Sequence, residues 1–156
     1  MLPTLRRLGA GLALAGSVLL APSLSAQKSL EIERFDATLR VEESGWLDVR
    51  EEILVRFTGS WNGIFRNIPV EYRTEQGFSF RLRLEDISVT GESGESLEYW
   101  SSRERHYRQL KIRVPGASDA TRKVVIHYRV PNGLRFQEEY DELYWNVTGD
   151  EWDMPI

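Results

Sequence analysis

The sequence predicts an all-β protein: an antiparallel β-sandwich, immunoglobulin-like in general shape, preceded by a signal peptide. Three observations predict this class. Apolar side chains recur at every second position in several runs, which is the period of a half-buried strand. Turn dipeptides separate these runs, and no stretch of the mature chain keeps a helical period. About seven short strands with regular turns fit a sandwich, with a partly open barrel as the alternative.

The segment 1–26 has the three parts of a secretory signal peptide. Arg6 and Arg7 form a basic start, the uncharged run 8–20 follows, and small residues complete the segment. This apolar run, about 13 residues long, is shorter than the ~20 residues that span a bilayer. We therefore expect export with cleavage after residue 25 or 26, and an uncleaved N-terminal anchor is the alternative. The remaining residues, 27–156, are expected to form one extracytoplasmic domain.

Two alternating runs predict a hairpin at the start of the mature chain: 30–41 and 46–57. Ser44-Gly45 supplies the short turn between them. In the first run, the apolar parity changes between Ile32 and Phe35. In the second run, Glu51 is the charged exception among the apolar positions.

Alternation in the rest of the chain predicts further strands: 78–89, 110–114, 124–130 and 143–147. The apolar parity changes at Glu85-Asp86, which predicts a β-bulge or bend. Leu143, Trp145 and Val147 share one parity, so we expect them on the inner face of a sheet. Turn dipeptides with mechanisms of their own separate the runs: Asn62-Gly63, Gln76-Gly77, Ser93-Gly94, Pro115-Gly116 and Asn132-Gly133.

The composition argues against several classes of function. The chain of 156 residues carries 24 acidic and 20 basic side chains, a net charge of -4, whereas nucleic-acid binding favours a basic stripe. Without cysteine it has no disulfide, thiolate metal site or cysteine nucleophile. His106 and His127 are too few for a multi-histidine metal cluster, and we expect both on solvated surfaces. No Gly-x-Ser-x-Gly elbow is present. We expect no enzymatic activity, no cofactor and no metal.

Acidic side chains gather near the C-terminal end: Glu138, Glu139, Asp141, Glu142, Asp150, Glu151 and Asp153. We interpret them as a solvated acidic rim. Calcium binding through oxygen ligands and glycoside hydrolysis by a carboxylate pair are the alternatives. The sequence has no Asp-x-Asp-x-Asp-Gly loop, which disfavours a calcium site of that type.

Two motifs carry a resemblance to a known family. The run 141–149, followed by Trp152 and Pro155-Ile156, and the Gly-Ile-Phe-Arg-Asn-Ile-Pro element at 63–69 resemble signatures of the DUF2207 family of predicted bacterial membrane proteins. The similarity covers Leu30–Ile156. The resemblance implies a signal peptide, an extracytoplasmic β domain, and membrane attachment through helices that these residues do not contain. It implies no catalytic residue. Because the sequence stops soon after a predicted strand, we expect it to be truncated.

Exposed aromatic and charged side chains are the candidates for binding. Trp61 and Trp100 lie beside turns, so they are surface candidates for stacking on sugar rings, whereas core packing is the alternative use of tryptophan. Arg66 lies among apolar neighbours, and an unpaired, partly buried guanidinium is costly. We therefore predict that Arg66 pairs with Asp141 or Glu142; the alternative is that it points to water.

These observations predict a non-enzymatic, extracytoplasmic module of a membrane-anchored envelope protein, which docks or senses on the periplasmic or extracellular face of a bacterial cell membrane. The expected partner is another envelope protein or a glycan, and no nucleic acid. A carbohydrate-binding module that uses exposed Trp and Tyr is the alternative. The candidate binding residues are Trp61, Phe65, Arg66, Trp100, Asp141 and Glu142.

Overall fold

The structure, a computed structural model, describes residues 28–73, 79–136, 138–143, 145–149 and 152. The expected signal peptide and the predicted turn at Gln76-Gly77 lie outside these residues. Every regular element in the described ranges is a β-strand. None of the described residues form a helix long and apolar enough to cross a membrane.

The larger layer is an antiparallel sheet of four strands in the order β1-β2-β9-β6. Its strands are β1 (Ser29–Val41), β2 (Leu47–Ser60), β9 (Ser118–Val130) and β6 (Glu85–Thr90). The strict alternation in β2 buries every second side chain from Leu47 to Phe57. The period of two in the sequence predicted that these side chains share the buried face of the strand.

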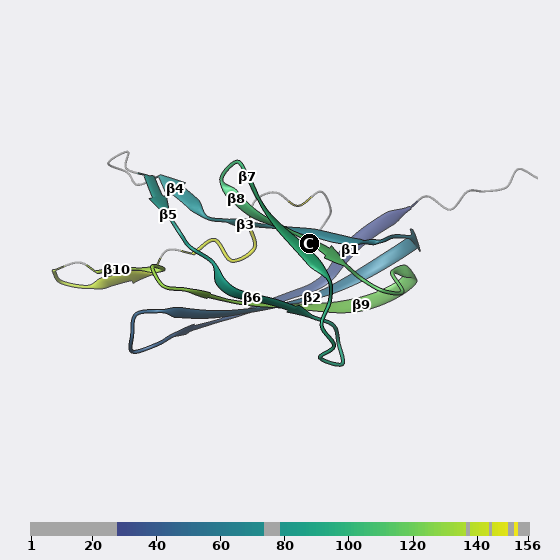
Figure 1. The fold of residues 1–156 in the computed structure, drawn as a ribbon, viewed down its shortest axis with the longest axis horizontal. Helices are drawn as coiled ribbons and strands as arrows, with labels where there is room; N and C mark the ends of the chain where they lie inside the picture. The colour runs from purple at the N-terminus through teal and green to yellow at the C-terminus, as the bar shows by residue number, and fades with distance from the viewer. Residues whose placement is uncertain (1–27, 74–78, 137, 144, 150–151, 153–156) are drawn as a thin grey trace, which may run out of the picture.

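A smaller antiparallel sheet, in the order β3-β8-β7, lies above the larger one in the view of Figure 1. Its strands are β3 (Gly63–Pro69), β8 (Tyr107–Arg113) and β7 (Tyr99–Glu104). Two short hairpins complete the described fold: β4 (Glu71–Arg73) with β5 (Ser79–Arg81), and β10 (Leu134–Phe136) with β11 (Asp141–Leu143).

The core lies between the two sheets and takes side chains from both. The larger sheet contributes Val49, Ile53 and Ile126, and the smaller one contributes Leu110 and Ile112, all almost fully buried. Two layers of antiparallel strands that bury their facing side chains make a sandwich. The predicted fold class is therefore confirmed.

The parity changes in the sequence mark real irregularities. The register of β1 against β2 shifts between Ile32 and Arg34, and that of β6 against β9 shifts between Glu85 and Ser88. Asp86, inside the second shift, has a φ of 52°. Both predicted bulges are confirmed, because an extra residue on one strand moves all later side chains to the other face.

The predicted inner-face strand at 143–147 is wrong. β11 ends at Leu143, whose side chain is 39% exposed, and Trp145 and Val147 are only half-buried. The chain instead leaves the hairpin and turns, with the backbone N–H of Gly149 donating to the side chain of Asn146 at 3.0 Å. We call residues 145–149 together with Trp152 the C-terminal strap. The predicted run 78–89 likewise divides into two strands, β5 and β6.

Candidate functional site

Two charged side chains, Glu51 and Arg66, lie in the core, and each is only 1% exposed. Glu51 occupies an inward position of β2, and Arg66 occupies the inward position of β3 between Ile64 and Ile68. Arg66 Nε donates to Glu51 Oε2 at 2.7 Å, and Nη2 donates to Oε1 at 3.0 Å. This two-point ion pair connects the two sheets through the core.

All five N–H groups of the Arg66 guanidinium have an acceptor. Beyond the two that bind Glu51, Nη1 donates to the backbone carbonyls of Asn67 and Thr148, at 2.8 and 3.0 Å. Nη2 also donates to the carbonyl of Val147 at 2.9 Å. Since a guanidinium has five donors, no further partner can be added. Arg66 therefore joins β2, β3 and the C-terminal strap at one point.

Aromatic rings enclose the same guanidinium. Its Cζ atom lies 5.3 Å from the ring centroid of Phe35 and 5.1 Å from that of Trp152. The two rings meet edge to face, with centroids 6.0 Å apart. The indole Nε1 of Trp152 also donates to the Thr148 carbonyl at 2.6 Å. Trp152 therefore binds the Thr148 carbonyl through its indole N–H and covers the Arg66 guanidinium with its ring. The contact between this cation and the aromatic ring is stabilising.

Tyr128 of β9 completes the buried network. Its hydroxyl donates to Glu51 Oε1 at 2.8 Å, and its ring stacks on that of Trp145 with centroids 6.1 Å apart. Burial raises the pKa of Tyr128 well above its ordinary value of 10.0, and the negative charge of Glu51 raises the pKa further. The hydroxyl therefore stays protonated and remains a donor. No buried side-chain polar atom of the described residues lacks a partner, so the polar atoms of this network are engaged within the protein.

The predicted pairing of Arg66 with Asp141 or Glu142 is wrong. Asp141 is exposed in β11, and Glu142 forms an ion pair with Arg135 of β10 at 3.4 Å. The acid that binds Arg66 is Glu51, because β2 and β3 face each other across the core whereas β11 belongs to a separate hairpin. Arg66 does reach the late segment, as we expected, but through two backbone carbonyls rather than a carboxylate.

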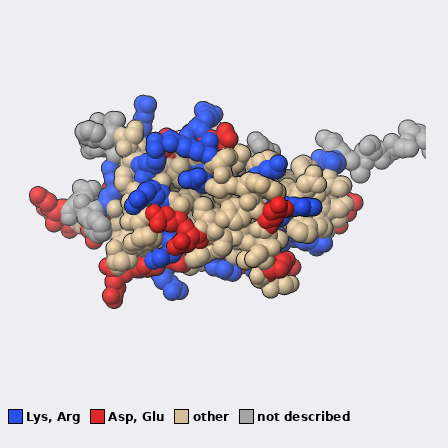
Figure 2. Space-filling model, in the orientation of Figure 1, with Lys and Arg blue, Asp and Glu red and all other residues tan. Residues whose placement is uncertain are grey.

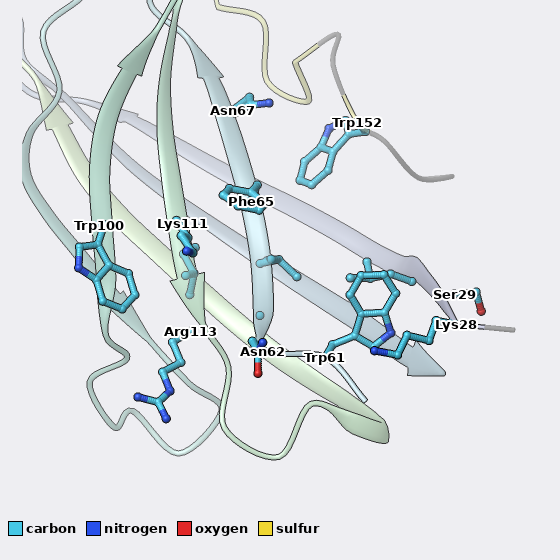
Figure 3. A pocket seen from close by; sticks show the side chains of 14 residues that line it. Lys28, Ser29, Trp61, Asn62, Phe65, Asn67, Trp100, Lys111, Arg113 and Trp152 are labelled. Atoms are coloured by element: carbon cyan, nitrogen blue, oxygen red, sulfur yellow. The ribbon is translucent and has the colours of Figure 1, made fainter. Parts of the chain in front are cut away.

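A groove of about 950 Å³ lies along β3, the edge strand of the smaller sheet (Figure 3). Phe65, Lys111 and Trp100 are direct cross-strand neighbours in β3, β8 and β7, and their side chains form a row on its outer face. Phe65 is 50% exposed and Trp100 is 52% exposed. Trp61 and Trp152 line the other side of β3. The structure therefore brings three of the predicted residues, Trp61, Phe65 and Trp100, into one groove.

The charges in this groove have one sign. Among the described residues that line it, Lys28, Lys111 and Arg113 are cationic and none is acidic. The ammonium of Lys28 lies 6.0 Å from the ring centroid of Trp61, and that of Lys111 lies 5.8 Å from that of Trp100. None of these cations is among the residues predicted from the sequence to bind. The signal was present in the run 110–114, where the apolar parity of the even positions turns Lys111 and Arg113 outward.

The other titratable candidates lie away from the groove. His127 Nε2 is 2.8 Å from Asp48 Oδ2 on the larger sheet, and the ring of His106 lies against Tyr107. Glu71 lies between Arg81 and Arg103 in the region where Figure 2 shows Lys and Arg gathered over β4, β5 and β7. A hydrogen bond from Arg81, assisted by the charge of Arg103, lowers the pKa of Glu71.

A second surface carboxylate, Glu52, behaves in the same way. Hydrogen bonds from Lys123 and then from Arg50 lower the pKa of Glu52. Carboxylates with lowered pKa values are ionised at neutral pH and suit ion pairing rather than proton donation. In the part of the chain that the structure describes, no three His, Asp or Glu side chains are grouped so that they could hold a metal ion.

Comparison with models of known protein families places the chain in a family. The family model described as the N-terminal domain of a predicted membrane protein (DUF2207) matches residues 31–156. This range includes β1 except its first residues, the buried network, β3 and the C-terminal strap. No curated protein and no solved structure matches the chain.

Proposed function

The chain belongs to the DUF2207 family of predicted membrane proteins, and from this premise we propose that it is a non-catalytic docking or sensing module of a bacterial envelope protein. The module lies on the extracytoplasmic side of the membrane. Its partner is another envelope protein or a glycan. Its contact surface is the outer face of the smaller sheet together with the groove along β3.

One observation carries this proposal: the exposed row of Phe65, Lys111 and Trp100. Large aromatic side chains on rigid strands are the usual anchors of binding surfaces, because they bury much area and lose little conformational freedom. These two are half exposed although the core beneath them is closed. The groove at β3 adds a concave surface beside them.

The buried network supports a binding role in another way. Arg66 fixes β3 from below through Glu51, and the strap fixes it from the side. A contact surface gains affinity when its supporting strand is already held in the binding conformation. The polar atoms of this network are all engaged within the protein, which suits a structural support for the surface.

Site-specific photo-crosslinking tests the docking proposal. A photoreactive phenylalanine analogue replaces Trp100 in cells that make the protein, and a matched variant carries it at Thr38, an exposed position of β1 on the larger sheet. We expect covalent adducts from position 100 and not from position 38. The proposal fails if neither position gives an adduct or if both give the same ones.

A labelling experiment tests the side of the membrane. The sequence contains no cysteine, so a single Thr38→Cys replacement provides the only thiol. A membrane-impermeant maleimide should label this thiol in intact cells as strongly as in lysed cells. Labelling only after lysis would place the domain in the cytoplasm.

A carbohydrate-binding module is the second candidate function, and the spacing of the exposed rings favours it. Phe65 and Trp100 are two strands apart, so roughly 10 Å separates them along the sheet, given the ~4.8 Å spacing of neighbouring strands. Flat apolar rings at such a distance can each stack on a sugar. Isothermal titration with neutral oligosaccharides tests this candidate: binding that Trp100→Ala abolishes would support it.

A further inference from the structure

We propose that the groove along β3 binds an anionic glycan, a chain of sugar rings bearing carboxylate or phosphate groups. This inference rests on the docking function proposed above and specifies its ligand. It is carried by the exposed aromatic rings of a single groove together with two cations, Lys28 and Lys111, that have no carboxylate partner among the described residues.

The aromatic rings account for the sugar part of the ligand. Trp100 and Phe65 present about half of their surface to solvent on one side of β3, and Trp61 stands on the other side. Trp61 is held in place because its indole N–H donates to the Thr58 carbonyl at 2.9 Å. Rings fixed on strands provide flat apolar faces, and a sugar presents a matching face of C–H groups.

The cations account for the negative charge of the ligand. The chain as a whole is acidic, with a net charge of -4, yet the described lining of the groove contains three cations and no carboxylate. Arg113 forms an ion pair with Glu98 at 3.2 Å. Lys28 and Lys111 have no carboxylate partner in the part of the chain that the structure describes, and each ammonium instead lies near a tryptophan ring. An anion that enters the groove therefore meets two positive charges that no acid in the described ranges neutralises.

A peptide that adds a strand to β3 fits the groove less well. Val114 N–H donates to the Asn62 carbonyl, so the backbone N–H and C=O groups of Asn62 point toward β8. Because these groups change side at each residue of a strand, those of Gly63, Phe65 and Asn67 point toward the free edge. The Asn67 carbonyl already accepts from Arg66, and Trp152 stands at this end of the groove. With the Asn67 carbonyl occupied, the free edge is limited to the stretch from Gly63 to Phe65, which is only as long as the shortest strands.

A bilayer surface also fits less well than a glycan. The volume of about 950 Å³ lies within the ~300–1,000 Å³ typical of ligand pockets, so the surface is a recess rather than a protruding anchor. Peptide and membrane binding therefore become outcomes that the experiment must separate from glycan binding.

The test is isothermal titration of the purified protein with probes of defined charge. The two anionic glycans are hexagalacturonate, which carries carboxylates, and a glucosylated poly(glycerol phosphate), which carries phosphates. Cellohexaose is the neutral sugar, hexaglutamate is the anion without sugar rings, and vesicles containing phosphatidylglycerol represent the membrane. We expect at least one anionic glycan to bind roughly tenfold or more tightly than the other three probes, and the better of the two identifies the anion.

Two variants of groove residues test whether the anionic glycan binds in the groove. Trp100→Ala should weaken binding of the anionic glycan roughly tenfold, because it removes an aromatic stacking surface. Lys111→Gln should weaken it and reduce its sensitivity to added salt. The matched controls are Tyr140→Ala, an equally exposed aromatic outside the groove, and Lys123→Gln on the larger sheet; both should bind as the parent does. All four residues are at least partly exposed, so the variants should fold.

Several results would overturn the inference. Equal binding of cellohexaose would remove the requirement for charge, and equal binding of hexaglutamate would remove the requirement for sugar. Binding of vesicles alone, binding of no probe, or unchanged binding by both groove variants would exclude an anionic glycan in this groove. If adducts still form from position 100 in cells, the docking function stands with a different ligand. If they do not, the docking function itself fails.

Discussion

The buried ion pair between Glu51 and Arg66 should be strongly coupled: removing both members should destabilise the protein by much less than the sum of the two single removals. In Arg66→Met, the carboxylate of Glu51 stays in the core with the Tyr128 hydroxyl as its remaining partner. In Glu51→Leu, the guanidinium of Arg66 keeps only its backbone acceptors. The double variant removes both charges and leaves side chains of similar volume.

The size of each effect follows from these contacts. Breaking a buried pair by removing one partner costs ~3–5 kcal/mol, because the other charge is left uncompensated. The double variant avoids that penalty but still leaves the carbonyls of Asn67 and Val147 without a donor, at ~1–3 kcal/mol for each buried group. We therefore expect a coupling energy of about 3 kcal/mol between the two positions, near the upper end of measured values. A domain stable by ~5–15 kcal/mol remains mostly folded in each variant.

Urea denaturation followed by circular dichroism measures the four free energies of this cycle. The matched control is the pair of Arg113 and Glu98, whose side chains are 67% and 55% exposed, and its coupling should be only ~0.2–1 kcal/mol. Hydrogen exchange supplies a second readout: in Arg66→Met the amides of the C-terminal strap should exchange faster, since the Val147 carbonyl loses its donor and the Thr148 carbonyl keeps only the indole of Trp152.

A coupling below about 0.5 kcal/mol in the buried pair, or one no larger than that of the exposed pair, would show that burial does not strengthen this ion pair. Unchanged hydrogen exchange in the strap of Arg66→Met would show that Arg66 does not hold that segment, whatever the coupling energy of the ion pair.

Three further predictions follow from other parts of the molecule. The folded state keeps the phenol proton of Tyr128 above pH 10.0, where the unfolded state loses it, so the stability of the protein falls as the pH rises beyond that value. The urea midpoint should therefore drop less between about pH 9 and 11 in Tyr128→Phe than in the parent protein. Equal drops in the two proteins would contradict this prediction. Gly149→Ala should lower the melting temperature more than Gly94→Ala, because both positions have a positive φ but only at Gly149 does the added Cβ meet a guanidinium nitrogen, at 3.1 Å; an equal loss would show that backbone strain alone matters. N-terminal sequencing of the exported protein should begin at Ala26 or Gln27, whereas a protein that starts at Met1 in the membrane fraction would favour an anchor.

Alternation along the chain predicted the faces of the strands well, since parity is a local property. It located both bulges, and it placed Glu51 among the inward positions of β2, where the structure finds it. Arg66 has the same inward parity between Ile64 and Ile68. Both charges occupy inward positions, but parity does not say which strand lies opposite, and the pairing of Glu51 with Arg66 was not predicted.

Contacts between distant segments could not be predicted in this way. Residues 65 and 100 meet in one groove only because β8 lies between β3 and β7, and that strand order is not encoded in any single run. The run 143–147 has the alternation of a strand, yet the strand ends at Leu143, and the carbonyls of Val147 and of the next residue, Thr148, accept hydrogen bonds from Arg66. Tertiary partners overrode the local pattern at that point.

The sequence separations within the buried network bear on how the chain folds as it is made. Glu51 lies 15 positions from Arg66 but 77 from Tyr128, and Arg66 lies 82 positions from Thr148. A chain that emerges from its N-terminus can form the ion pair early, whereas the hydroxyl and the carbonyls that complete its shell arrive near the end of synthesis. Proteins dominated by such distant pairings fold in milliseconds to seconds, more slowly than helical bundles. During synthesis, the shell of the ion pair therefore stays incomplete until the strap has emerged, and in this interval the chain depends most on help against aggregation.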